Sequence, residues 1–564
     1  MNRNRVSLAL ALGWIVVFLG STARGAAPTL TRLEPSGASR GSTVEVKAIG
    51  TFAKWPLRGW VEGKGVTVEA LKDSGKFRFT VAADALAGPR WVRLFDDEGA
   101  SVCRPFVIGT VAETAEIEPN DAPRSAQKLS LLPLVVNGKL GKTEDVDVFA
   151  VSLKKGQTLV AAVEARRALA SPMDGVLQVV SPAGFTLAQN DDDGLGLDPR
   201  LIYQSPADGT VLVRLFAFPA TPDSSIRFAG GEAFVYRLML STGPVIDQPW
   251  PLAVEAKGSG QVGLTGWNLP KKGFETKVHV VDHDHAVVAP PEFANTAEVR
   301  VVPHASMVEI EPSASDSPQP LNVPVTLSGR IDPSRDLDAF RFDARKGVKL
   351  RIQVEARAIG SPLDPTLRVL DPSGKTLFEG DDSDRAGRDL DATITPEVDG
   401  PHRLIVADLL GRGGPRSVYR LTVAPLSPDF ALTLAEDRAT VKAEGSTTWK
   451  VGVDRKNGHD RPIEVRVTGL PEGVKCDPAV STAQGESAKS VTLTIRAAKG
   501  PLSGPIRVEG IERDGEKRVR VASSTVADIG RPVLEAWLTV LPKPLIGPPA
   551  PAASVAPSVE KKKK

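Results

Sequence analysis

Apolar and polar residues alternate along much of the chain, in runs too short for helices. In residues 350–355, Leu350, Ile352 and Val354 alternate with arginine, glutamine and glutamate. A period of two places the apolar side chains on one face of a strand and the polar side chains on the other. Leu159, Ala161 and Val163 occupy the matching positions of an earlier segment. The pattern therefore predicts amphipathic β-strands.

Turns rich in proline and glycine separate these strands. Residues 181–184 read Ser-Pro-Ala-Gly, and residues 371–374 read Asp-Pro-Ser-Gly. Proline presets φ for a turn, and glycine accepts the positive φ that many turns need. The chain has 51 glycines and 46 prolines, which both disfavour helix interiors. Short strands with turns at this spacing predict an all-β fold of tandem sandwiches.

Two long segments match each other at an offset of about 190 residues, as from position 145 to position 336. Residues 145–184 and 336–374 share D-x-D-x-F, KG, VEAR, SP-x-D and P-x-G in the same order. Upstream, EIEPND at 116–121 corresponds to EIEPSA at 309–314. Two unrelated runs of this length would not agree so well by chance, so the chain contains a duplicated module.

Smaller β segments surround the duplicated module. In residues 31–52 and 252–269, a glycine turn leads into an alternating strand that ends at a second glycine. At roughly 100–200 residues per domain, a chain of 564 residues holds several domains. The predicted organisation is a signal peptide at 1–26, a small β domain at 27–109, a sandwich at 110–245, a small β domain at 246–304, a second sandwich at 305–426, an immunoglobulin-like sandwich at 427–543 and a disordered Pro/Ala/Lys tail at 544–564.

Short motifs recur in the duplicated segments in a fixed order. They are E-P-N-D at 118–121, D-x-D-x-F at 145–149 and 336–340, KG at 155–156 and 346–347, and Y-x-L at 236–238 and 419–421. In this order the segments resemble the bacterial pre-peptidase C-terminal (PPC) domain family, over about 110–240 and 305–425. The resemblance implies a jelly-roll-like sandwich, usually appended to secreted proteases. Some members, in clostridial collagenases, bind collagen and hold calcium near the N-terminal linker.

The small β domains resemble immunoglobulin-like domains of the IPT/TIG type. This weaker resemblance covers residues 28–109 and 246–303. The arrangement as a whole is similar to large secreted proteins of planctomycete-type bacteria. The resemblance thus implies an exported protein built from modules.

Carboxylates gather where each duplicated segment begins. Asp145 and Asp147 lie two residues apart in an extended run, so their side chains point the same way. Carboxylates at the rim of a core need a partner, and calcium takes six to eight oxygen ligands. The predicted first site comprises Glu116, Glu118, Asn120, Asp121, Asp145 and Asp147. In the PPC family, the matching acidic positions of this linker carry calcium.

The second copy departs from this pattern, since Ser313 and Ala314 replace the Asn-Asp pair. Its predicted ligands are Glu309, Glu311, Asp336 and Asp338, and we expect a weaker or absent calcium site. An alternative is that the aspartates cap turns or pair with Arg166 and Arg357.

Two other clusters offer possible ligands. The acidic loops at 191–193 and 381–384 lack the spacing of an EF-hand and are interpreted as solvated hairpin tips. His279, His283 and His285 lie beside two aspartates, Asp282 and Asp284, in a run that leads from a strand into a turn. Alternate residues there would share one side and ligate a metal, but an exposed loop is the favoured interpretation.

The N-terminus predicts export. Arg3 and Arg5 precede an apolar run from about Val6 to Leu19, and small residues follow, as in a secretory signal peptide. A retained membrane anchor is the alternative, although the run is short for a bilayer. We expect a secreted, periplasmic or cell-surface protein with no membrane span in the mature chain.

The remaining chemistry is sparse. The two cysteines, Cys103 and Cys476, lie far apart and are interpreted as free thiols in different domains. Lys and Arg total 70 against 68 for Asp and Glu, so no overall charge favours nucleic acid. The sequence contains no His-Glu-x-x-His and no Gly-x-Ser-x-Gly motif.

The sequence therefore predicts a noncatalytic, secreted or cell-surface binding or adhesion protein, with calcium as a possible cofactor. Its partner would be an extracellular or envelope protein or a polysaccharide. The alternatives are a structural protein of the cell envelope and an accessory component of a secreted peptidase. The chain has only three tyrosines, which are favoured anchors at binding surfaces, and this weakens a collagen ligand.

Overall fold

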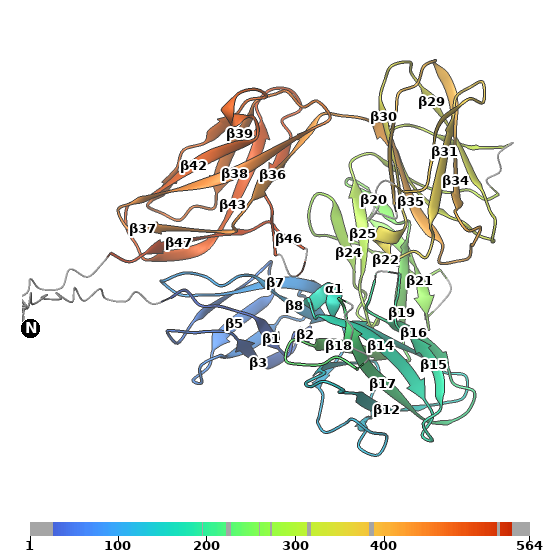
Figure 1. Ribbon diagram of the computed structural model, residues 1–564, viewed down its shortest axis with the longest axis vertical. Helices are drawn as coiled ribbons and strands as arrows, with labels where there is room; N and C mark the ends of the chain where they lie inside the picture. Colours follow the sequence, from blue (N-terminus) through green and yellow to red (C-terminus); the bar gives the residue numbers. More distant parts are fainter. Residues whose placement is uncertain are drawn as a thin grey trace, which may run out of the picture.

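The computed structural model describes residues 26–543 except 195, 222–226, 259, 271–272, 313–316, 383–388, 527–528 and 530. The predicted all-β tandem sandwich is confirmed, because paired sheets follow one another along the chain (Figure 1). In the described residues the helical segments are single turns, namely α1 (Arg166–Leu169), η1 (Arg357–Ile359) and η2 (Glu486–Ala488).

Four sequence predictions fall wholly or partly on residues outside this description. They are the signal peptide except Ala26, the C-terminal tail, the Ser313-Ala314 replacement in the second copy, and positions 383–384 of the predicted hairpin tip at 381–384. Among the described residues, no helix combines the length and the apolar character needed to cross a membrane.

The N-terminal unit, residues 27–109, consists of two facing sheets with strand orders β1-β3-β6-β5 and β2-β8-β7-β4. Phe77, Phe79 and Phe106 fill the space between them and are fully buried. Its strands are β1 (Arg32–Glu34), β2 (Gly37–Ser39), β3 (Thr43–Ile49), β4 (Arg58–Val61), β5 (Val66–Ala70), β6 (Lys76–Val81), β7 (Gly88–Phe95) and β8 (Arg104–Gly109).

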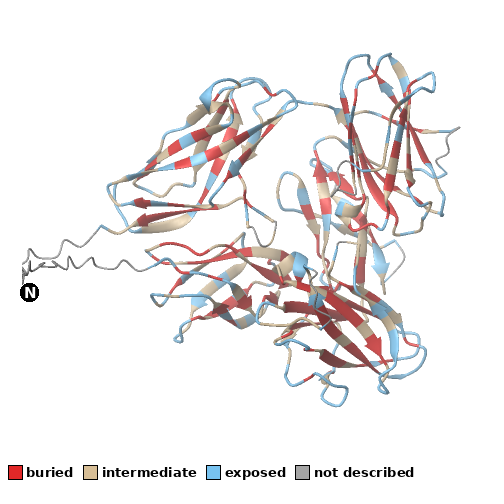
Figure 2. Cartoon of the chain, in the orientation of Figure 1, coloured by how far each residue is buried: buried red, intermediate tan, exposed pale blue. Residues whose placement is uncertain are grey.

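The first sandwich, residues 110–245, pairs sheets of order β10-β12-β17-β14-β15 and β16-β13-β18-β11-β9. Alternate residues such as Phe149, Val213 and Leu238 form the core between them, which appears red in Figure 2. Its strands are β9 (Glu113–Ala115), β10 (Gln127–Leu129), β11 (Leu134–Lys139), β12 (Asp147–Leu153), β13 (Thr158–Glu164), β14 (Met173–Val180), β15 (Thr186–Asn190), β16 (Arg200–Gln204), β17 (Gly209–Pro219) and β18 (Val235–Ser241).

The second sandwich, residues 305–426, repeats this topology strand for strand, with orders β27-β29-β34-β31-β32 and β33-β30-β35-β28-β26. The registers also correspond, since Asp147 pairs with Leu215 in one copy and Asp338 with Val406 in the other. Its strands are β26 (Ala305–Val308), β27 (Gln319–Leu321), β28 (Val325–Arg330), β29 (Asp338–Ala344), β30 (Leu350–Glu355), β31 (Pro365–Leu370), β32 (Thr376–Gly380), β33 (Leu390–Ile394), β34 (Gly400–Asp408) and β35 (Val418–Pro425).

The middle unit, which corresponds to the predicted segment 246–304 and begins with β19 at Val245, joins the two sandwiches through sheets β19-β21-β22 and β20-β25-β24-β23. Phe293 and Val299 lie in its small core. Its strands are β19 (Val245–Trp250), β20 (Ala253–Glu255), β21 (Gln261–Trp267), β22 (Glu275–Lys277), β23 (His279–Val280), β24 (His285–Val288) and β25 (Ala297–Val302).

The C-terminal sandwich, residues 427–543, pairs sheets β36-β38-β42-β40 and β37-β47-β43-β39-β41, with β44 at the side of β43 and a separate β45-β46 ribbon. Its strands are β36 (Asp429–Leu434), β37 (Arg438–Lys442), β38 (Ser446–Lys456), β39 (Ile463–Thr468), β40 (Val474–Cys476), β41 (Ala479–Ser481), β42 (Ser490–Ala497), β43 (Leu502–Glu512), β44 (Val519–Val521), β45 (Ser524–Thr525), β46 (Pro532–Val533) and β47 (Ala536–Leu541).

A charged junction holds the two repeated sandwiches and the middle unit together. Asp247 of the middle unit pairs with Arg200 of the first sandwich at 2.9 Å and with Arg416 of the second at 2.9 Å. Asp193 pairs with the same two arginines, at 2.6 Å and 3.2 Å. Both guanidinium groups also lie over the ring of Trp267, at 4.9 Å and 5.7 Å.

The interpretation of residues 191–193 as a solvated hairpin tip is wrong for Asp193. Its side chain is only 17% exposed, because the loop docks on the second sandwich. A Cβ on Gly194 would lie 2.1 Å from the carbonyl oxygen of Gly360, so only glycine allows this approach. Asp191 and Asp192 are exposed, as expected for a loop tip.

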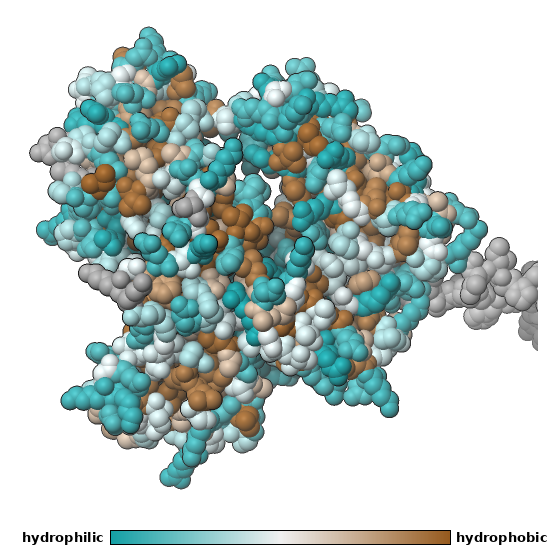
Figure 3. Space-filling model, turned by 180° about the vertical axis from the view of Figure 1, so that it is seen from behind, coloured by the Kyte–Doolittle hydropathy of each residue, from teal (hydrophilic) through white to brown (hydrophobic). Residues whose placement is uncertain are grey.

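The C-terminal sandwich packs back onto the N-terminal unit, as the neighbouring β7 and β46 in Figure 1 illustrate. Buried Arg93 forms an ion pair with Asp437, and the indole nitrogen of Trp91 donates to the carbonyl of Pro532 at 3.1 Å. Trp537 packs against Phe95 with ring centroids 4.7 Å apart. Seen from behind, apolar side chains gather between the units, whereas the outer tips are hydrophilic (Figure 3).

We predict that Asp247→Asn loosens the junction, because it leaves two arginines facing each other without this carboxylate. The expected loss is about 2 kcal/mol, typical of removing one partner from a largely desolvated ion pair. The midpoint of the first thermal unfolding transition should fall accordingly. Asp208→Asn, in an exposed pair with Lys154 at 3.4 Å, is the control and should change little. Equal midpoints for both variants would contradict the assignment.

Candidate functional site

Carboxylates converge where the chain enters the first sandwich, at the open end between its two sheets. Asp147 begins β12 and is fully buried, whereas Glu116 and Glu118 follow β9 in the linker. One oxygen from each of these three carboxylates lies within 4.8 Å of the others. Asp121 and Asp145 form a second group of the same kind around Glu118. The structure therefore brings together the five acidic residues predicted for this site.

Asn120, the remaining predicted ligand, is buried inside the group. With its amide nitrogen turned inward, it donates to Asp147 Oδ1 at 3.0 Å and to Glu118 Oε2 at 3.3 Å. Turned over, the same amide would present its oxygen to the two carboxylates. That second orientation is favourable only with a cation between the oxygens.

Tyr236 is the residue that sequence reasoning missed. It lies in β18 of the opposite sheet, and its hydroxyl is 2.6 Å from Asp147 Oδ2 and 2.8 Å from Glu116 Oε2. Glu116 also accepts a hydrogen bond from the backbone N–H of Lys139 at 2.8 Å. A Cβ on Gly138 would lie 2.3 Å from the tyrosine oxygen, so β11 carries glycine opposite the ring. The Y-x-L motif common to both copies was the signal for this role.

Lys142 competes for the second group of carboxylates. Its ammonium lies 2.9 Å from Asp121 and 3.5 Å from Asp145. The lysine partly neutralises these two aspartates, so Glu116, Glu118 and Asp147 form the better-defined candidate for a bound ion.

The second copy retains the same arrangement. Glu309, Glu311 and Asp338 each place one oxygen within 4.8 Å of the others. The hydroxyl of Tyr419 in β35 is 2.6 Å from Asp338 Oδ2, and Glu309 accepts from the N–H of Arg330 at 2.7 Å. Gly329 faces Tyr419 as Gly138 faces Tyr236.

Asp336 lies outside this triad. Its carboxylate accepts hydrogen bonds from the N–H groups of Asp332 and Leu337, at 3.2 Å and 2.9 Å. The alternative pairing of the aspartates with Arg166 or Arg357 does not occur among the described residues. These two arginines lie elsewhere in their sandwiches, and their backbone N–H groups donate to Asp198 and Asp389. The structure thus groups three of the four residues predicted for the second site.

Burial makes these carboxylates reluctant to ionise. Burial, reinforced by the charge of Glu116, raises the pKa of Asp147 to about 9. Burial and the neighbouring Glu309 raise the pKa of Asp338 to about 10, and burial raises the pKa of Glu309 to about 7. A cation among the oxygens would remove the repulsion that opposes ionisation.

Within the two clusters, Asp145 Oδ1, Glu309 Oε1 and Asp338 Oδ1 are buried and accept no hydrogen bond from a donor among the described residues. Asp145 Oδ1 has only the Lys142 ammonium, at 3.5 Å, and Glu309 Oε1 and Asp338 Oδ1 have only each other's carboxyl groups to share a proton with. An unpartnered buried carboxylate oxygen is costly, and a hard cation satisfies it directly. The donors are all oxygens, which suits calcium better than zinc. The residues of both copies therefore fit calcium, which would supply the missing positive charge.

The histidine cluster lies elsewhere, on the β23-β24 hairpin of the middle unit. One ligand atom each of Asp282, His283 and Asp284 lies within 4.8 Å of the others. Asp284 is already engaged, by His285 Nδ1 at 2.7 Å and by Arg300 at 3.0 Å. The free thiols also lie apart, Cys103 buried and Cys476 partly exposed.

Comparison with known proteins gives limited matches. No family model matches the chain, so the PPC resemblance rests on the motifs described above. Over 99 residues the chain is 34% identical to a probable subtilase-type serine protease of Deinococcus radiodurans. This match covers 17% of the chain and only 14% of the protease.

Several solved structures show a distant similarity, with 10–12% sequence identity for the three described here. Fibronectin(III)-like modules of Clostridium thermocellum CbhA are 12% identical, with 35% of this chain and 88% of theirs covered, at a TM-score of 0.14. Alpha-2-macroglobulin from Escherichia coli is 12% identical, with coverage of 92% and 42% and a TM-score of 0.16. Domains 1–6 of the surface layer protein SbsC are 10% identical, with coverage of 92% and 54% and a TM-score of 0.16.

We predict that Tyr236→Phe destabilises the first sandwich, because it removes a hydroxyl that donates to a buried carboxylate. The expected loss is about 1–3 kcal/mol, the cost of leaving a buried acceptor unsatisfied. Thermal unfolding in the presence of a chelator provides the measurement. Tyr203→Phe is the matched control, since its hydroxyl has no hydrogen bond among the described residues. If both variants have the same unfolding temperature as the parent protein, the Tyr236 hydroxyl does not stabilise the first sandwich.

Proposed function

We propose that this chain is a noncatalytic binding or adhesion protein of the cell exterior, with a calcium ion at the entrance of each repeated sandwich. The observation that carries the proposal is the twofold occurrence of one buried cluster, Glu116, Glu118 and Asp147 in the first copy and Glu309, Glu311 and Asp338 in the second. Because both copies of the duplicated module keep the same cluster of carboxylates, we attribute the cluster to the module itself.

Calcium at these positions would fix the linker to the sandwich. Glu116 and Glu118 belong to the linker that leaves the N-terminal unit, whereas Asp147 belongs to the core strand β12. An ion held by both would stop the linker from rotating, so the angle between successive units would become rigid. A rigid series of modules presents its surfaces in a fixed relation to an extended partner.

The export signal predicted from the sequence supports an exterior location, since Arg3 and Arg5 precede an apolar run that small residues follow. The partner would then be an extracellular or envelope protein or a polysaccharide. PPC membership is part of this proposal and is supported by the order of motifs in both copies.

We predict that calcium raises the thermal unfolding temperature of the full chain relative to chelator. A ligand at about 100 times its dissociation constant adds about 2.7 kcal/mol to the folded state. Glu118→Gln should reduce the shift for the first sandwich, and Glu311→Gln should reduce it for the second. Glu144→Gln, at an exposed glutamate in the same loop region, is the matched control and should retain the shift. An unchanged midpoint with calcium and chelator would remove calcium from the proposal.

A second candidate is an accessory component of a secreted peptidase, favoured by the 34% identity to part of a subtilase-type protease. Under this hypothesis the purified chain would form a stable complex with a peptidase encoded beside it, and size-exclusion chromatography of the two would show co-elution. Elution of the chain as large homogeneous assemblies would instead favour the structural envelope protein. Elution as a monomer that binds envelope polysaccharide in sedimentation assays would favour the leading proposal.

A further inference from the structure

Arginines from two units line one cavity between the first and the C-terminal sandwich. The cavity has a volume of about 350 Å³. Its lining residues comprise three arginines, one aspartate and three apolar or small residues, namely Arg166, Arg167, Arg531, Asp198, Gly196, Leu197 and Ile529. Positive charge therefore dominates a space that two separate parts of the chain enclose.

None of the three arginines has a carboxylate within ion-pair distance among the described residues. Most arginines at the other junctions do have one, as Arg200 and Arg416 demonstrate. Burial, and to a smaller extent the charge of Arg167, lowers the pKa of Arg531. Glu298 and Glu62 lie near enough to oppose this effect, but neither forms an ion pair with Arg531.

Asp198 does not neutralise the cluster, because its carboxylate serves the backbone of α1. It accepts from the N–H groups of Arg166 at 2.8 Å, Arg167 at 3.1 Å and Ala165 at 3.3 Å. These N–H groups are therefore occupied, and the arginine side chains are what remains available to a ligand.

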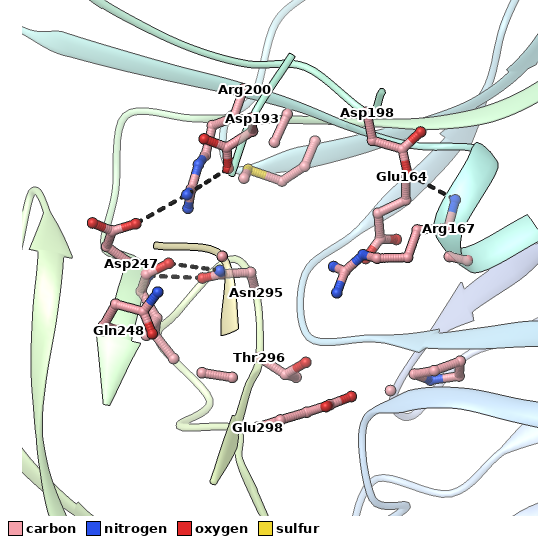
Figure 4. A pocket seen from close by; sticks show the side chains of 18 of the residues that line it. Glu164, Arg167, Asp193, Asp198, Arg200, Asp247, Gln248, Asn295, Thr296 and Glu298 are labelled. Atoms are coloured by element: carbon pink, nitrogen blue, oxygen red, sulfur yellow. Dashed lines mark hydrogen bonds and ion pairs between the residues drawn. The ribbon is translucent and has the colours of Figure 1, made fainter. Parts of the chain in front are cut away.

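Two of these arginines also border a larger cavity. Arg167 and Arg531 also line a cavity of about 500 Å³ between the units. Figure 4 shows the guanidinium group of Arg167 extending from α1 into this cavity, opposite Thr296 and Glu298 of the middle unit. A ligand held by the arginines would therefore have room for a carrier group beyond its anion.

We propose that Arg166, Arg167 and Arg531 bind a tetrahedral dianion, sulfate or phosphate, free or as an ester. Guanidinium groups recognise such oxyanions through paired, charge-assisted hydrogen bonds. The lining of the smaller cavity holds three arginines and one aspartate. Glu298 and Glu62 act on Arg531 from outside that lining, so the arginine side chains there outnumber the carboxylates that could oppose an anion. The bound anion would bridge the first and C-terminal sandwiches and remove the repulsion between Arg167 and Arg531.

The second sandwich offers an internal comparison. Its Asp389 accepts from the N–H groups of Ala356, Arg357 and Ala358, as Asp198 does in the first copy. Arg357 thus corresponds to Arg166, but Ala358 replaces Arg167. The proposed anion site therefore needs Arg167 of the first copy and Arg531 of the C-terminal sandwich, and Arg357 of the second copy is a matched control. The anion site goes beyond the proposed function, because it uses none of the calcium ligands.

The test is isothermal titration of the full chain with sodium sulfate and with sodium phosphate, at constant ionic strength. We expect saturable binding that weakens at least tenfold in Arg531→Gln and in Arg167→Gln, and that stays unchanged in Arg357→Gln. Arg167 is exposed on α1, so its variant should fold normally, which circular dichroism verifies. The absence of binding, or equal binding by all variants, would overturn the proposal.

Two further titrations identify the class and source of the anion. Sodium acetate should bind at least tenfold more weakly than sulfate, and equal binding would exclude a preference for tetrahedral dianions. A sulfated disaccharide that binds at least tenfold more tightly than inorganic sulfate would assign the site to an ester on a sugar. Equal or weaker binding of the disaccharide would assign it to the free anion.

Discussion

Taking a charged side chain out of water costs several kcal/mol unless a partner compensates for the lost hydration. This constraint determines how the units of the chain meet. Asp247 lies between two arginines from different sandwiches, and Arg93 of the N-terminal unit is buried against Asp437 of the C-terminal sandwich. Where carboxylates face one another, as Glu309 and Asp338 do, the same constraint raises their pKa values and favours a cation between them.

The local pattern of the sequence was sufficient for the strands and for part of the site. Alternation predicted the sheets, and the D-x-D-x-F motif predicted which carboxylates enter the core. The role of Tyr236 could not be predicted in this way, because it requires β18 to pair with β11 and to face β12 across the core. Asp336 shares the motif with Asp338, but a local turn uses its carboxylate.

Contacts between distant parts of the chain explain the remaining differences. Asp193 was expected to be solvated, since its loop contains three consecutive aspartates. It is instead largely buried, because Arg416 reaches it from a unit more than 200 positions away in the sequence. Similarly, no pattern in the sequence marks Arg531, and only the docking of the C-terminal sandwich brings it to the same cavity as Arg167. The period of apolar residues in the sequence predicts which face of a strand is buried. Contacts between residues of different sandwiches depend on how the whole sandwiches are oriented, which this local pattern does not contain.

The return of the C-terminal sandwich to the N-terminal unit has a mechanical consequence. A string of modules joined only by linkers lengthens at once under tension. Here, a pull between the first and last described units would load the Trp537–Phe95 packing and the Arg93–Asp437 pair before any linker straightened. The contact should therefore resist small pulling forces. Once it has separated, the five units are free to extend along the direction of the pull.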